Sequence, residues 1–368
     1  MEHTTVIRID GRPYQVDPDG TMFEVSEEVA REIVELSAIV EQIEESPIAS
    51  TTPIPLGDRF DRALALASKL HRNQPRKGTT IPYVAHLVGV AALVLEDGGN
   101  EDEAIAALLH DAVEDQGGRA TLELIRRDFG DDVARIVESC SDTDVVPKPP
   151  WRTRKEQYLA HLRTAPSSIV RVSLADKLHN ARALTTDLRS HGEELWRRFN
   201  SESDQLWYYR SLARTFRELD AGPMAAQLER EVLELETLAI ISALKHLVAY
   251  GDRGDYAGHH VIIHDPPTGY YIQFAVDEGG LFCEAVHNDY LDDERQLTSN
   301  QVDELLAMGW DHPAYPEQNF YRVLRPTSDE DYRHIVTLVR GAFDRVYRIP
   351  TTQPVLESSW SRGALGRS

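Results

Sequence analysis

An apolar segment that ends in four polar residues constrains the fold of this chain more than any other feature. Residues 104–109 read Ala-Ile-Ala-Ala-Leu-Leu, which predicts a helix that is buried on most sides. His110 and Asp111 follow directly, and Glu114 and Asp115 lie one turn further along the same face. An imidazole and a carboxylate at a buried helix end can bind one divalent metal ion. A capped helix whose acidic end faces water is an equally good interpretation of this dipeptide.

The length and the charge of the chain limit its architecture and its partners. A chain of 368 residues predicts two domains with small additions. The formal net charge of -22 argues against binding to DNA, RNA or anionic membranes. Cys140 and Cys283 lie far apart without metal-type spacing, so we expect neither a disulfide framework nor a zinc site. Because no signal peptide or membrane span is recognisable either, we expect a cytoplasmic protein.

The first 56 residues predict a small N-terminal segment to which we assign no chemistry. Residues 4–16 alternate around a turn at Asp10 and Gly11, which predicts a β-hairpin. A helix is expected over residues 26–45, and residues 46–56 contain three prolines, as is typical of a linker.

Two groups of basic residues stand out against the acidic composition. Those of the first group lie close to Pro75 and Gly78 and are Arg72, Arg76 and Lys77. Those of the second group lie around three prolines and are Lys148, Arg152, Arg154 and Lys155. We expect both groups on exposed loops, where they can bind phosphate groups or simply be solvated.

Polar residues also interrupt two other apolar helices. Pro82 can begin a helix in which His86 has apolar neighbours, although a single histidine there is more often a core residue than a ligand. In the helix predicted over residues 167–187, Asp176 and Asn180 follow an apolar run and lie one turn apart. Because a carboxylate without a partner is costly to bury, Asp176 suits a metal ligand, and Asn180 is then free to bind substrate or water.

Six ordered sequence blocks resemble the HD-domain hydrolases of the RelA/SpoT type, and in particular the small alarmone hydrolases. The resemblance covers residues 58–220. The blocks are Arg76-Lys77-Gly78-Thr79, Pro82-Tyr83-Val84-Ala85-His86, residues 110–115, Phe129-Gly130, Thr143-Asp144 with Pro147-Lys148, and residues 174–180. The chain departs from the family's usual Thr- and Asp-rich pattern in residues 116–119, and we find no synthetase pattern after residue 220.

The resemblance implies an all-helical metal-dependent domain over residues 57–222. It implies one divalent ion per chain, usually Mn²⁺, bound by residues that match His86, His110, Asp111 and Asp176. The pair Glu114 and Asp115 would then position and activate the attacking water. The residues that would line the nucleotide pocket are Arg76, Lys77, Tyr83, Lys148 and Asn180.

The activity that the resemblance implies is removal of the 3′-pyrophosphate from (p)ppGpp or a related nucleotide. One alternative is a binding module that senses an alarmone or an NADP-like nucleotide with little turnover. Another is an NADPH 2′-phosphatase, because this type of pocket can accept a different ribose phosphate. The presence of both Glu114 and Asp115 favours an enzyme, since a binding module needs no such pair.

After residue 222 the sequence predicts a smaller α+β domain, so the fold class is a multi-domain protein with an all-α hydrolase first. A helix over residues 224–250 precedes three alternating strands near residues 260–264, 270–276 and 281–286, which predict an antiparallel sheet. Residues 223–350 resemble the peptide-binding chaperone-like domains related to YbjN and type III secretion chaperones, which implies a protein or peptide partner. Residues 351–368 are rich in Ser and Arg and predict a disordered tail. The sequence does not determine the oligomeric state.

Overall fold

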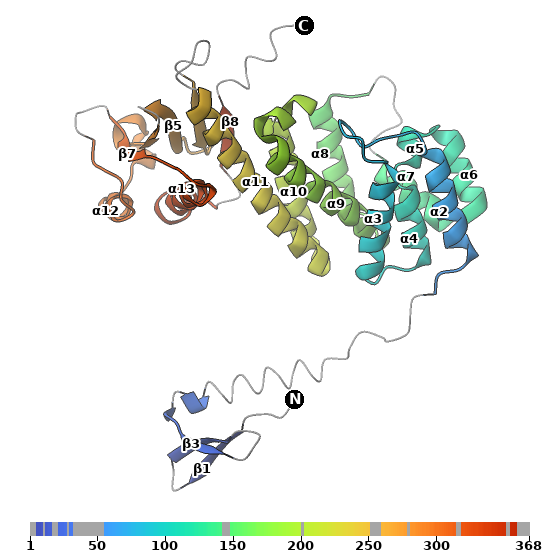
Figure 1. The fold of residues 1–368 in the computed structure, drawn as a ribbon, viewed down its shortest axis with the longest axis horizontal. Coiled ribbons are helices and arrows are strands. Elements are labelled where there is room, and N and C mark those ends of the chain that lie inside the picture. The colour runs from blue at the N-terminus through green and yellow to red at the C-terminus, as the bar shows by residue number, and fades with distance from the viewer. Residues whose placement is uncertain are drawn as a thin grey trace. The chain divides into compact units, whose positions relative to one another are not determined.

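The structure is a computed structural model, and its fold is drawn in Figure 1. The residues that it describes are 5–9, 12–16, 21–27, 29–31, 55–141, 148–199, 202–250, 259–277, 280–313, 318–350 and 354–358. The chain divides into two compact units, Met1–Pro55 and Leu56–Ser368.

The N-terminal unit contains a small antiparallel sheet. Its strands follow one another in the order β1 (Thr5–Ile9), β2 (Arg12–Val16) and β3 (Met22–Glu24). Ile9 pairs with Arg12, which confirms the predicted hairpin, and β3 adds a third strand that the sequence analysis did not predict. The predicted helix over residues 26–45 and the linker over residues 46–56 lie almost entirely outside the described residues.

The second unit begins with the predicted all-helical region. Its helices are α2 (Asp58–Leu70), α3 (Val84–Glu96), α4 (Glu101–Leu109), α5 (Ala112–Asp115), α6 (Arg119–Phe129), α7 (Asp131–Cys140), α8 (Trp151–Leu162), α9 (Ser167–His191), α10 (Glu202–Glu218) and α11 (Gly222–Tyr250), with a 3-10 helix at Gly192–Arg198. Helix α4 packs against α2, α3, α7 and α9 and is central to this group (Figure 1). None of residues 104–109 exposes more than 1% of its surface, which confirms the predicted buried helix.

The two ends of α4 explain how it delivers polar groups to one place. At its start, Asn100 and Glu103 form a capping box, in which each side chain accepts a hydrogen bond from the other's backbone N–H. Arg171 from α9 neutralises the buried Glu103 carboxylate at 2.8 Å. At the other end the helix stops at His110, and Asp111 begins the short α5. The direction of the chain therefore changes at the two polar residues that the sequence singled out.

One predicted loop is in fact partly helical. The basic group expected on a single loop over residues 141–155 is split, because α8 begins at Trp151 and carries Arg152, Arg154 and Lys155. Pro149 and Pro150 stand directly before the helix, where proline leaves no hydrogen bond unmade, so the prolines mark a helix start here instead of a continuous loop. Lys148 lies before them, and residues 142–147 are outside the described residues.

The C-terminal part is the predicted α+β domain with an antiparallel sheet. Its elements are β4 (His260–His264), β5 (Tyr271–Asp277), β6 (Gly280–Ala285), α12 (Ser299–Ala307), β7 (Phe320–Leu324), α13 (Asp329–Gly341) and β8 (Val355–Ser358). The five strands pair in the order β7-β6-β5-β4-β8, and every pair is antiparallel. The prediction of a disordered tail from residue 351 is wrong for β8, because pairing with β4 satisfies its backbone groups and Leu356 is buried.

Helix α11 belongs to the cores of both parts. It packs along α9 and α10 on one side and contacts α13, β4 and β5 on the other. The boundary that the sequence analysis placed between residues 222 and 223 therefore passes through a continuous core. No helix in the described part of the chain is both long and apolar enough to span a membrane.

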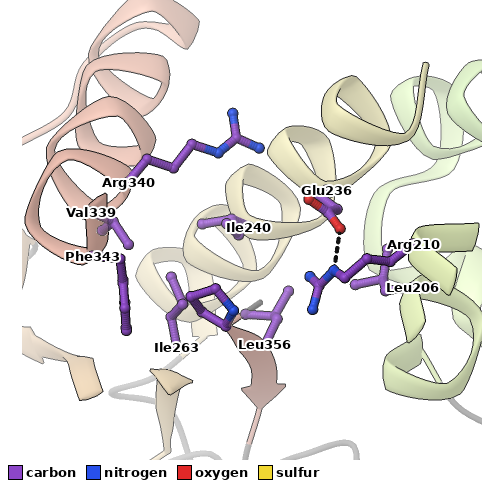
Figure 2. Close-up of a pocket in the computed structure, with 10 residues that line it drawn as sticks. Leu206, Arg210, Glu236, Ile240, Ile263, Val339, Arg340, Phe343 and Leu356 are labelled. Atoms are coloured by element: carbon purple, nitrogen blue, oxygen red, sulfur yellow. Dashed lines mark hydrogen bonds and ion pairs between the residues drawn. The ribbon is translucent and has the colours of Figure 1, made fainter. Parts of the chain in front are cut away.

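A small cavity of about 30 Å³ lies where α10, α11, α13 and β8 meet (Figure 2). Glu236 of α11 is buried in its wall, and Arg210 of α10 donates a hydrogen bond to it at 2.7 Å. Burial raises the pKa of the Glu236 carboxyl, although Arg210 acts in the opposite direction. Figure 2 shows Arg340 of α13 on the far side of the cavity, and this arginine donates to the carbonyl oxygen of Leu233 at 3.0 Å. Polar contacts thus join the helical region to the sheet domain.

Candidate metal centre and the cleft beside it

Four predicted ligands come together from four helices. They are His86 on α3, His110 at the end of α4, Asp111 at the start of α5 and Asp176 on α9. The ligand atoms of His86, His110 and Asp176 all lie within 4.8 Å of one another. Nε2 of His110 lies 3.0 Å from Oδ2 of Asp111. All four residues therefore present a nitrogen or oxygen atom to one point.

The spacing of these atoms suits a single metal ion. Nε2 of His86 lies 3.2 Å from Oδ1 of Asp176 and 3.6 Å from Oδ2 of Asp111. Ligand atoms that share one ion through bonds of about 2.1 Å are separated by roughly 3.0–3.4 Å in octahedral or tetrahedral geometry. Imidazole nitrogens combined with carboxylate oxygens suit a first-row divalent ion.

The hydrogen bonds of His110 leave its other nitrogen available as a ligand. Nδ1 of His110 lies 2.8 Å from the carbonyl oxygen of Ala107, and a carbonyl can only accept, so Nδ1 carries the proton. With the proton on Nδ1, the buried Nε2 of His110 carries a lone pair and faces carboxylate oxygens of Asp111 and Asp176, which are also acceptors, so none of the described residues donates a hydrogen bond to it. A buried nitrogen of this kind is costly without a partner, and a metal ion would supply one. Burial lowers the pKa of His110, but Asp111 and Asp176 raise it more, and the net shift is upward.

Helix α9 supplies more than the one predicted carboxylate. Lys177 donates to Oδ2 of Asp176 at 2.7 Å, and Asn180 donates to Oδ1 at 2.5 Å. Burial raises the pKa of the Asp176 carboxyl, but Lys177 and the imidazoles of His110 and His86 lower it by more than burial raises it. The net pKa is therefore well below its ordinary value, and the carboxylate stays charged. The sequence analysis predicted Asn180 but missed Lys177, whose ammonium group stabilises the charged form of the neighbouring Asp176.

His179 is a second residue that the sequence analysis missed. Its Nδ1 lies 2.9 Å from Nδ1 of His86. Burial, followed by the nearby His86 and Arg76, lowers the pKa of His179 to about 4, so its ring is neutral near pH 7. The available signal was its spacing, because His179 lies three residues after Asp176 and therefore on a neighbouring face of α9.

The tyrosine predicted to line the pocket contacts Asp111, one of the predicted metal ligands, directly. The hydroxyl of Tyr83 donates to Oδ2 of Asp111 at 2.5 Å. Burial raises the pKa of Tyr83, and Asp111 raises it further, so the hydroxyl keeps its proton. Burial also raises the pKa of Asp111, but His110 and His86 lower it more, and Asp111 remains a carboxylate.

The two acidic residues predicted to activate water have different partners. Oε1 of Glu114 lies 3.0 Å from the ammonium group of Lys148, another predicted site residue. Oδ2 of Asp115 accepts from Gln74 at 2.7 Å, and Oε1 of Gln74 accepts from Gln116 at 2.6 Å. Burial is the main cause of a raised pKa at Asp115. Gln116 is a residue at which the chain departs from the family pattern. It does not bond to Asp115 itself but to Gln74, which in turn donates to Asp115.

A cleft of about 580 Å³ lies beside the metal centre. Arg76, Lys77, Tyr83 and Asn180, four of the five predicted nucleotide-binding residues, line it. The remaining lining includes two further arginines and two aromatic residues, which are Arg182, Arg198, Phe199 and Tyr209. The ammonium group of Lys77 lies 5.4 Å from the centre of the Phe199 ring. Cations and aromatic rings around a cleft of this size suit a phosphorylated nucleotide.

Comparisons with known proteins match the two parts of the chain separately. An HD-domain family model matches residues 63–213. A second model, described as T3SS (YopN, CesT) and YbjN peptide-binding chaperone 3, matches residues 241–361.

Curated relatives match the helical region. Guanosine-3′,5′-bis(diphosphate) 3′-pyrophosphohydrolase MESH1 of Xenopus tropicalis is 40% identical over 125 residues, which are 33% of this chain and 67% of that protein. A guanosine-3′,5′-bis(diphosphate) 3′-pyrophosphohydrolase of Haemophilus influenzae is 34% identical over 125 residues, or 18% of its length. A solved structure of a metazoan ortholog of SpoT is 26% identical, with a TM-score of 0.40, and the match covers 50% of this chain and 96% of that one.

Proposed function

The chain belongs to the HD-domain family that contains these MESH1-like and SpoT-like proteins, and from that membership we propose that it removes the 3′-pyrophosphate of guanosine 3′,5′-bis(diphosphate) or a close relative. The relatives' names supply the reaction, namely hydrolysis of the bond between the ribose 3′ oxygen and the first phosphorus. The products are pyrophosphate and a nucleotide with a free 3′ hydroxyl group.

The observation that carries this proposal is a four-residue ligand set next to a cationic cleft. His86, His110, Asp111 and Asp176 fit one divalent ion, for which we propose Mn²⁺. Such an ion acts as a Lewis acid on a phosphate oxygen and lowers the pKa of water. Arg76 and Lys77, which line the adjacent cleft, offer positive charge to the phosphates of the nucleotide.

The remaining site residues divide the work of positioning and proton transfer. Tyr83 holds Asp111, and Asn180 holds Asp176 while it accepts a hydrogen bond from Arg76 at 2.8 Å. We assign Glu114 as the general base that takes a proton from the attacking water, with Asp115 as its neighbour that orients the same water. We propose that Lys148, which pairs with Glu114 in the structure, binds a phosphate group of the substrate in place of that carboxylate.

The C-terminal domain supports a second, separate assignment. The matched family is described as peptide-binding, and we propose that this domain binds a peptide or protein partner. We also place the protein in the cytoplasm, because Cys140 and Cys283 are free thiols, which are typical of a reducing compartment.

A substrate panel tests the proposed reaction. The full chain is incubated with Mn²⁺ and either ppGpp, pppGpp, ppApp or NADPH, and the products are identified by mass. We expect pyrophosphate release from a 3′-pyrophosphorylated nucleotide, and loss of that release after treatment with EDTA. Phosphate release from NADPH alone would identify a 2′-phosphatase instead. Binding without any product would identify a nucleotide sensor.

A further inference from the structure

The two metal-facing histidines are held in different ways. The backbone carbonyl of Ala107 fixes the ring of His110 from within its own helix, at 2.8 Å. His86 on α3 has instead the ring of another histidine, His179 on α9, at 2.9 Å between the two Nδ1 atoms. The orientation of His86 therefore depends on a side chain of another helix.

The direction of this hydrogen bond follows from the position of His86. Its Nε2 faces Asp176 and Asp111 at 3.2 and 3.6 Å, so Nε2 is the atom available to a metal ion and must carry a lone pair. The proton of the neutral ring is then on Nδ1, and His86 donates it to Nδ1 of His179. The opposite direction would put the proton of His86 on Nε2, where it would block the ligand position.

Gly89 gives an independent sign that the space beside His86 is reserved for His179. A Cβ atom at position 89 would lie 2.4 Å from Nε2 and 2.5 Å from Cδ2 of the His179 ring, closer than atoms can approach. Gly89 lies inside α3 and has no positive φ, so its backbone does not require glycine. Glycine inside a helix is about 1 kcal/mol less favourable than alanine. The close approach of His179 explains why the smallest residue stands there.

We propose that His179 is a positioning residue, which fixes the tautomer and the ring orientation of His86, and that Gly89 makes room for it. Partners that hold a ligand histidine through its second nitrogen typically change metal affinity by about 10–100-fold when they are removed. The proposal rests on the proposed metal site but not on the identity of the substrate. It assigns a role to the histidine of the block at residues 174–180, for which the sequence analysis gave none.

Metal affinity measured without nucleotide tests this role. The metal-free full chain is titrated with Mn²⁺ by calorimetry, and circular dichroism checks that each variant is folded. We expect His179→Ala to weaken Mn²⁺ binding by about 10–100-fold. His179→Asn keeps an acceptor oxygen near the position of Nδ1, and we expect it to restore affinity to within about three-fold of the wild type. Gly89→Ala should weaken binding in the same direction, because the added methyl group displaces the ring.

Two control variants separate positioning from general damage to the helices. His191→Ala removes an exposed histidine near the end of α9, and Val88→Ala changes a residue on α3 that is 45% exposed. Both should bind Mn²⁺ as the wild type does. Wild-type affinity in folded His179→Ala, or an Asn variant no better than the Ala variant, would overturn the role of His179. A wild-type protein that binds no Mn²⁺ would overturn the metal site as well. A wild-type protein that binds Mn²⁺ but does not hydrolyse the nucleotide would contradict only the proposed substrate, and the metal titrations would still decide the role of His179.

Discussion

Buried polar side chains serve different ends in the helical region and in the sheet domain. In the helical region His86, His110 and Asp176 are almost fully buried, and their ligand atoms face one another across helices. In the sheet domain Asp265 is also fully buried, but its Oδ2 accepts from the hydroxyl and the backbone N–H of Thr268 in the turn after β4. Burial of a polar group is therefore not enough to mark a site. The convergence of ligand atoms from several helices on one point distinguishes the helical region.

The largest expected effect tests whether the two regions can be separated at all. A chain truncated to residues 56–221 lacks α11, whose buried residues pack along α9 and α10, and we expect it not to fold. We expect the free energy lost with these buried contacts to exceed the whole free energy of unfolding of a typical domain, which is about 5–15 kcal/mol. A chain of residues 56–250 keeps α11 and should fold and bind Mn²⁺. Circular dichroism and metal titration compare the two, and a folded, metal-binding 56–221 chain would contradict the shared core.

The next effect concerns the chemistry of the helical region. Glu114→Gln keeps the size of the side chain but cannot accept a proton, and we expect kcat for nucleotide hydrolysis to fall by about 10²–10⁴-fold with little change in KM. Glu123→Gln changes an exposed glutamate on α6 and serves as the control. If Glu114→Gln instead raises KM and leaves kcat within a few-fold, Glu114 binds substrate and Asp115 becomes the candidate base.

A smaller effect is expected at the cationic cleft. Lys77→Ala removes a charge-assisted contact worth about 1.5–3 kcal/mol, which corresponds to a rise in KM of roughly 10–100-fold. Lys69→Ala removes an exposed lysine at the end of α2, outside the residues that line the cleft, and should leave KM unchanged. Steady-state kinetics at fixed Mn²⁺ make the comparison. Equal KM values for the two variants would show that Lys77 does not contribute to substrate binding.

The smallest effect belongs to the buried aspartate of the sheet domain. Asp265→Ala leaves the hydroxyl and the N–H of Thr268 without their acceptor, and we expect a loss of about 1–3 kcal/mol in the free energy of unfolding. Urea unfolding followed by circular dichroism measures it. Hydrolysis and Mn²⁺ affinity should stay at wild-type values, because Asp265 closes a turn and contacts no residue of the metal centre. Reduced Mn²⁺ affinity in this variant would show that Asp265 affects the metal centre and has more than a local role in the sheet domain.

Local sequence signals predicted the parts of the fold that depend on local interactions. The capping box at Asn100 and the apolar run before His110 define α4 within a few residues, so both its ends were predictable. The alternation of residues 260–264 and 281–286 likewise predicted β4 and, within one residue at each end, β6. The pattern of β8 is short and follows a segment rich in polar residues, and only its distant partner β4 makes it a strand.

The sequence predicted the residues that meet at the candidate metal centre, but not the side chains that hold them in position. A histidine or aspartate that interrupts an apolar helix is visible in the sequence, as His86 and Asp176 are. The contact of His179 with His86 joins residues 93 positions apart, and it depends on how closely α3 and α9 approach each other. Gly89 permits that approach, but a single glycine in a helix does not reveal which side chain fills the space beside it.

The length of α11 limits how such a chain can be rearranged in evolution or in the laboratory. Its 29 residues form one uninterrupted helix that is part of two cores. A genetic exchange at residue 222 would replace α11, so that α9 and α10 would have to pack against a helix from another protein. An exchange between α11 and β4 would keep the native packing of α11 on α9 and α10. We therefore expect the C-terminal domain to be replaceable at a junction downstream of Tyr250, and a new domain that packs on the side of α11 now in contact with β4, β5 and α13 would keep that apolar face out of water.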